Sequence, residues 1–132
     1  MRNNLWFQHD YDNIDDINDA TLEEALKLLA GIKWESYLEN IRANPDDYCP
    51  PGLGIDTKND SFFHLYRNEN DWGLLLQLNG SKKILGMIPK ELCNNTYIVN
   101  SLKDIPQAIK LLYSEDYELL LEFCNSKYFL DV

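Results

Sequence analysis

The sequence has few of the residues on which metal sites and catalytic sites depend. Its 132 residues include three cysteines and two histidines. Cys49, Cys93 and Cys124 are far apart and form no C-x-x-C pair, so the common zinc and thioredoxin-type motifs are excluded. Their odd number and wide spacing favour free thiols in a reducing compartment.

Long apolar segments are also missing. No stretch reaches the roughly 18 consecutive apolar residues of a membrane span, and the first residues lead into no extended apolar region. The sequence therefore predicts a protein without a signal peptide or a membrane span, which acts in the cytoplasm.

Recognisable catalytic motifs are absent as well. There is no G-x-S-x-G and no phosphate-binding loop, and Gly52-Leu53-Gly54 lacks the third glycine of a dinucleotide-binding motif. His9 has no serine or cysteine motif around it, and His64 lies in an aromatic segment where a packed histidine is expected. We therefore predict that the protein is not an enzyme and uses no cofactor.

Basic residues are outnumbered. Twelve Lys and Arg face 22 Asp and Glu, which gives a net charge of −10. A negative field of this size repels nucleic acid and anionic membranes and speeds encounters with basic proteins. We predict no nucleic-acid partner and no membrane partner.

The acidic residues are concentrated near the start of the chain. Seven of them lie between Asp10 and Glu24 with no Lys or Arg among them: Asp10, Asp12, Asp15, Asp16, Asp19, Glu23 and Glu24. A calcium-binding EF-hand loop starting at Asp10 would need Gly where Asp15 stands and Glu where Thr21 stands. The run therefore predicts no metal site.

Part of this run has a local explanation. Asp19, Glu23 and Glu24 lie at or near the start of a predicted helix, where carboxylates interact favourably with the helix dipole. The acidic residues that precede the helix are either a solvated surface or a surface for a basic partner. We favour the second interpretation, in which the candidate binding residues are Asp10, Tyr11, Asp12, Asp15, Asp16, Asp46, Asp47 and Tyr48.

The composition is that of a globular protein, and the length suits a single domain spanning residues 1–132. Thr21 and Glu24 form a capping box, and two apolar stripes follow it at helical spacing. They predict N-terminal helices at about 21–42. Residues 43–60 are rich in Pro, Gly, Asp and Asn and predict a long loop, which is either functional or a crossover to a sheet.

The second half of the chain begins with strand-like segments at 61–67, 72–78, 83–88 and 96–100, and Asn79-Gly80 is a strong hairpin signal. These segments predict an antiparallel meander of three to four strands at about 61–100. Apolar residues at helical spacing then predict C-terminal helices at about 102–126. The predicted class is α+β, with the meander packed by the N-terminal and C-terminal helices.

The chain resembles the small acidic immunity proteins of bacterial contact-dependent growth inhibition and other polymorphic toxin systems. The resemblance lies in the acidic front Asp10–Glu24, in DWGLLLQLNGSKKILGMIPKE at 71–91 and in DIPQAIKLLYSEDYELLLEFC at 104–124. It implies an antitoxin that binds and neutralises one cognate toxin domain, often a basic nuclease, in the cytoplasm. The alternative is a small ligand-binding or regulatory α+β domain without catalysis.

Overall fold

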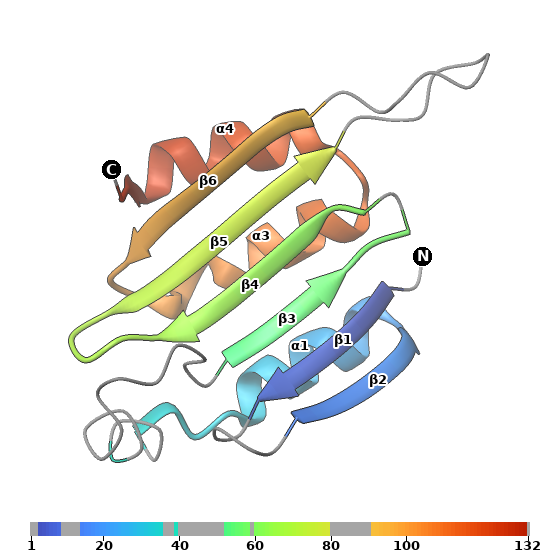
Figure 1. The fold of residues 1–132 in the computed structure, drawn as a ribbon, viewed down its shortest axis with the longest axis vertical. Helices are drawn as coiled ribbons and strands as arrows, with labels where there is room; N and C mark the ends of the chain where they lie inside the picture. The colour runs from blue at the N-terminus through green and yellow to red at the C-terminus, as the bar shows by residue number, and fades with distance from the viewer. Residues whose placement is uncertain are drawn as a thin grey trace.

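The computed structural model describes residues 3–8, 14–35, 39, 52–58, 60–79 and 91–131. They form an antiparallel sheet with helices packed on one of its faces (Figure 1). The sheet has seven strands in the order β2-β1-β3-β4-β5-β6-β7. The strands are β1 (Asn3–Gln8), β2 (Ile14–Ala20), β3 (Gly52–Asp56), β4 (Phe62–Arg67), β5 (Trp72–Asn79), β6 (Glu91–Val99) and β7 (Phe129–Leu130). The helices are α1 (Leu22–Gly31), the short 3-10 helix η1 (Leu102–Asp104), α3 (Ile105–Tyr113) and α4 (Tyr117–Lys127).

The predicted class α+β holds only in its broad sense, because the predicted architecture is wrong. The sheet is not a meander of three to four strands packed by N-terminal helices. Three of its strands, β1, β2 and β3, precede residue 61 and extend the sheet on one side. They come from a short apolar run, from the acidic run and from the segment predicted as a long loop.

The predicted meander also differs in its connections. We expected Asn79-Gly80 to join two short strands in a tight turn. Instead β5 pairs directly with β6, and Asn79 lies opposite Glu91. The segment 83–88, predicted as a strand, lies outside the described residues.

One face of the sheet, which we call the covered face, packs against the helices. Alternate residues of the central strands are buried there, including Leu53, Ile55, Phe63, Leu65, Leu74, Leu76, Leu78, Tyr97 and Val99. The helices contribute Ala25, Ile105, Ile109, Leu112 and Leu120 to the same cluster. Burial of these apolar side chains is the main force that holds the sheet and helices together.

Hydrogen bonds fix the start of the helical layer. The Thr21 hydroxyl accepts from the backbone N–H of Glu24, whose carboxylate in turn accepts from the N–H of Thr21, so the predicted capping box is present. The Tyr113 hydroxyl of α3 donates to the carbonyl oxygen of Ala20 at 3.1 Å. This buried bond joins the end of β2 to the helical layer.

Within the described residues, α4 is the longest helix at 11 residues, and no helix is both long and apolar enough to cross a bilayer.

Candidate functional site

The structure describes two of the eight candidate residues. Asp15 and Asp16 lie on β2, at one end of the sheet, and both are exposed. The other six candidates, Asp10, Tyr11, Asp12, Asp46, Asp47 and Tyr48, lie outside the described residues. The acidic surface can therefore be followed only along β2 and the strands beside it.

The position of β2 gives its carboxylates a structural role that the sequence did not indicate. In the sheet order β2 is a terminal strand and pairs only with β1. Charged side chains on a terminal strand oppose the addition of a further strand. A bulge near Asp19, whose φ is 53°, interrupts the pairing, and the N–H of Asp19 donates to the Asn4 side chain at 3.1 Å.

The sheet face opposite the helices, which we call the open face, has no described helix or strand over it (Figure 1). Residues opposite one another in neighbouring strands point to the same face. Starting from Trp6, the register assigns these described residues to the open face: Asn4, Asp16, Gly52, Gly54, Asp56, Phe62, His64, Tyr66, Gly73, Leu75, Gln77, Asn94, Thr96 and Ile98. It is therefore a mixture of aromatic, aliphatic, amide and acidic side chains.

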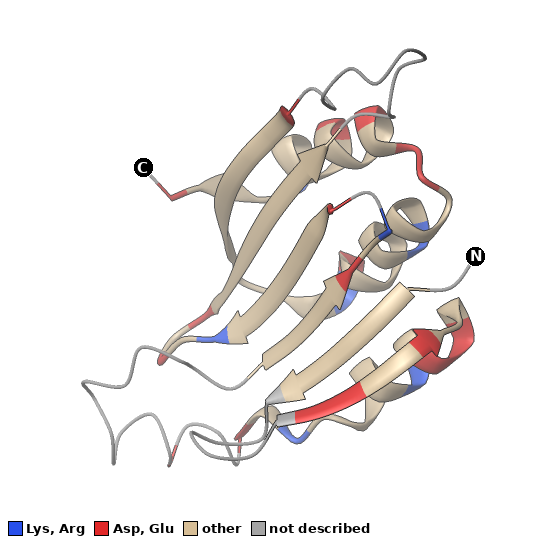
Figure 2. Cartoon of the chain, turned by 45° about the vertical axis from the view of Figure 1, so that its right-hand side comes forward, with Lys and Arg blue, Asp and Glu red and all other residues tan. Residues whose placement is uncertain are grey.

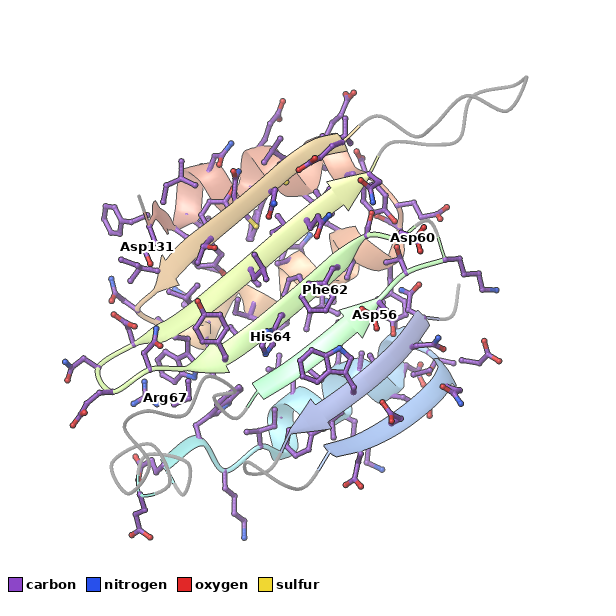
Figure 3. All side chains as sticks on the ribbon, viewed as in Figure 1. Asp56, Asp60, Phe62, His64, Arg67 and Asp131 are labelled. Carbon is purple, nitrogen blue, oxygen red and sulfur yellow. The ribbon has the colours of Figure 1, made fainter. Side chains whose placement is uncertain are left out.

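Four rings of this face are in contact, and we call them the aromatic row: Trp6, Phe62, His64 and Tyr66. The His64 ring centroid lies 4.6 Å from that of Trp6, 5.8 Å from that of Phe62 and 5.1 Å from that of Tyr66. Trp6 and Phe62 stack at 6.1 Å with an interplanar angle of 17°. His64 is thus the centre of the row, as Figure 3 shows for its position on β4.

Glycines allow the rings to lie close to the sheet. A Cβ at Gly54 would overlap the Trp6 indole, and a Cβ at Gly73 would overlap the Tyr66 ring. Each ring therefore occupies the space that a side chain on the neighbouring strand would need. This packing leaves the rings half-buried, with part of each available for contact.

His64 is held in its neutral form. Burial lowers its pKa from 6.5 to about 4. Its Nε2 atom is buried and has no hydrogen-bond partner. At neutral pH the centre of the aromatic row is therefore an uncharged ring and adds no positive charge to the open face.

Two carboxylates border the aromatic row, and we call them the carboxylate pair: Asp16 and Asp56. Asp16 lies opposite Trp6 on β2, and Asp56 pairs with Phe62 of β4 (Figure 3). Burial, and secondarily the charge of Asp16, raises the pKa of Asp56. Two acidic groups thus repel each other beside an aromatic surface, which costs stability.

No basic residue compensates them on the strands that the structure describes. None of the described open-face strand positions carries Lys or Arg. In Figure 2 the described basic residues lie on the helices, in the coil after α1, in a turn and at the end of β4, whereas β2 carries acidic residues. The described part of the open face is therefore an uncharged surface with an aromatic centre and an acidic border.

The described residues hold no group of three or more His, Cys, Asp or Glu side chains that could bind a metal ion. The chemistry of the open face lies in aromatic contact and negative charge. Such groups can bind a partner.

Most of the aromatic row was missed at the sequence level. We expected His64 to be packed, and its ring does contact three others, but we did not expect Phe62 and His64 to lie on the open face of the sheet. The signal was present, because Phe62, His64 and Tyr66 alternate with buried residues, as the two faces of a strand require. Trp6 could not be added to them, since its pairing with β3 depends on a contact far along the chain.

Comparison of the chain with models of protein families, with curated proteins and with solved structures gives no match.

Proposed function

We propose that this protein is an immunity protein that neutralises a basic toxin domain, such as a nuclease, by binding it with the open face of the sheet. The observation that carries the proposal is the aromatic row bordered by carboxylates that have no basic partner among the described residues. The acidic front Asp10–Glu24, which includes Asp16, was one of the three segments that carried the resemblance drawn from the sequence.

The aromatic row supplies the contacts that give affinity. Binding energy in protein interfaces is concentrated in a few residues, among which Trp and Tyr are enriched. Trp6 and Tyr66 are half-buried, and Trp6 is held against His64 while Tyr66 lies over Gly73. Because these rings are already ordered, they lose little conformational entropy when a partner covers them.

The carboxylate pair supplies charge complementarity. The net charge of −10 attracts a basic domain at a distance, and Asp16 and Asp56 then select the open face for contact. On a nuclease, such carboxylates would occupy the surface that binds substrate phosphates. A basic side chain of the partner also relieves the repulsion between the two carboxylates. Binding therefore stabilises a carboxylate pair that destabilises the free protein.

The proposal predicts that a large secreted toxin is encoded directly upstream of this protein. Its C-terminal domain is expressed in cells with and without this protein, and the purified pair is studied by stopped-flow kinetics. We expect growth to be rescued by the wild type. The double variant Asp16→Asn/Asp56→Asn should associate about tenfold more slowly at low salt, with a weaker dependence on salt.

Two further variants distinguish the effect of charge on association from the effect of aromatic contacts on dissociation. Glu118→Gln/Glu122→Gln removes the same charge from exposed positions of α4 and should associate at nearly the wild-type rate. Phe62→Ala should leave association nearly unchanged and speed dissociation at least tenfold. Absence of a toxin gene, failure to rescue growth, or equal effects of the two charge variants would each contradict the proposal.

A further inference from the structure

A second surface of the molecule has a different chemistry from the open face. A cavity of about 470 Å³ lies where the ends of β4 and β5 meet the residues that follow α1. Its described lining consists of Ile32, Lys33, Trp34, Glu35, Arg67 and Trp72. Arg67 follows Tyr66 and therefore points to the opposite face of the sheet, away from the aromatic row (Figure 3).

Arg67 is a half-buried cation without a carboxylate partner among the described residues. Its guanidinium carbon lies 4.3 Å from the centre of the Trp72 ring, in a cation–π contact. Its Nη1 donates to the carbonyl oxygen of Asp71 at 2.6 Å, whereas its Nε is buried and has no acceptor. Glu35 lines the same cavity but forms no ion pair with Arg67.

Trp72 adds a second donor without an acceptor. Its indole Nε1 is also buried and has no hydrogen-bond partner. Trp34 packs its ring perpendicular to that of Trp72 at 6.1 Å, so the wall around the donors is aromatic. Unsatisfied buried donors are costly, and an anionic acceptor that entered here would reduce that cost.

We propose that this cavity binds a small organic carboxylate with a planar apolar body. A carboxylate matches the fork of the Arg67 guanidinium, which can donate two parallel hydrogen bonds to it. The apolar body would lie against Ile32 and the indole of Trp34. The described lining carries two cations, Lys33 and Arg67, and one anion, Glu35, so its net charge of +1 is balanced by a single negative charge rather than by a phosphate dianion. The volume lies within the range of small-molecule sites.

The three tryptophans of the chain make the proposal testable by NMR. The full-length protein is labelled with ¹⁵N, and its indole N–H signals are followed during titration with 2-naphthoate. We expect saturable shifts of the Trp34 and Trp72 signals, while that of Trp6, on the open face, stays in place. The neutral isostere 2-naphthamide should bind at least about tenfold more weakly, since it lacks the charge that Arg67 recognises.

Substitutions assign the effect to Arg67. Arg67→Gln should weaken 2-naphthoate binding about tenfold and abolish its advantage over 2-naphthamide. Lys110→Gln removes the same charge at an exposed position of α3, and it should change neither the affinity for 2-naphthoate nor the advantage over 2-naphthamide. Arg67→Lys keeps the charge without the planar fork and should bind with intermediate affinity. An unshifted Trp6 signal serves as the check that each variant is folded.

A peptide with a free C-terminal phenylalanine distinguishes the source of the carboxylate. Tighter binding of the peptide than of 2-naphthoate assigns the cavity to a chain terminus, and weaker binding assigns it to a small molecule. Equal affinity for naphthoate and naphthamide would overturn the proposal, as would an unchanged preference in both Arg67 variants or the absence of a saturable shift. None of these outcomes depends on toxin binding at the open face.

Discussion

At the scale of single residues, two glycines determine the geometry of the aromatic row, because aromatic rings fill the space that a larger residue at either position would need. At Gly54 an added Cβ would overlap the Trp6 indole, and at Gly73 it would overlap the Tyr66 ring. Gly31, at the end of α1, has no atom within 4 Å of such a Cβ. The three positions therefore respond differently to the same change.

Gly54→Ala should lower the free energy of unfolding by about 1–3 kcal/mol, the usual cost of forcing extra volume into a packed site. Gly31→Ala is the matched control, and it should be neutral or raise stability by up to about 1 kcal/mol because alanine favours the helix. Urea denaturation measures both values. Equal stabilities of the two variants would show that Trp6 does not lie over Gly54.

His64 gives the aromatic row a dependence on pH. Its pKa of about 4 in the folded protein is below the 6.5 of an exposed histidine, so the unfolded chain binds a proton first as the pH falls. Its contribution therefore destabilises the fold between pH 6.5 and pH 4, by at most about 1.4 kcal/mol for each pH unit. Above pH 6.5 both states are neutral, and the effect is absent.

His64→Phe should therefore lose less stability than the wild type when the pH is lowered from 7 to 4.5. The carboxylates titrate in both proteins, so the difference between their urea midpoints isolates the histidine. Parallel pH profiles would mean that the imidazole is accessible to protons in the folded state.

At the scale of elements, the terminal strand β2 combines a pairing-competent edge with carboxylates. No described strand pairs with its outer side. Asp15→Thr/Asp16→Thr removes both charges and introduces residues that favour strands, so we expect concentration-dependent self-association in sedimentation velocity. Asp15→Lys/Asp16→Lys restores like-charge repulsion and should remain monomeric. If both variants are monomeric, the carboxylates of β2 do not protect this edge.

The elements also show what local sequence could predict. The capping box at Thr21 was predicted because a cap acts within one turn of its helix. The strands predicted at 61–67 and 72–78 correspond to β4 and β5, because their residues favour strands locally. In these cases neighbouring residues suffice to determine the structure.

The strands β2 and β3 could not be predicted in the same way. β2 has the sequence IDDINDA, whose Asp and Asn disfavour strands, and pairing with β1 overrides that preference. β3 has the sequence GLGID within a Gly-rich and Pro-rich segment, so its glycines indicated a loop. Its alternation of glycine with buried Leu53 and Ile55 was nevertheless a usable strand signal.

At the scale of the whole molecule, the candidate site is built from segments far apart in the chain. Trp6 and Asp16 come from the first two strands, Asp56 from β3 and the other rings from β4. Of its two carboxylates, Asp16 was among the residues predicted from the acidic run Asp10–Glu24, and Asp56 was not. Its aromatic centre was not predicted either, because no local pattern states which distant strand lies beside which.

The long-range pairing of β1 with β3 has a consequence for the order in which the molecule assembles. The hairpin of β4 and β5 needs only a short loop closure, whereas β1 must meet β3 across most of the first half of the chain. We therefore expect β1 to dock late in folding and to bring Trp6 onto Gly54 as it does. Until then the open face lacks the Trp6 indole and Asp16, so we expect the complete surface only in the fully folded chain.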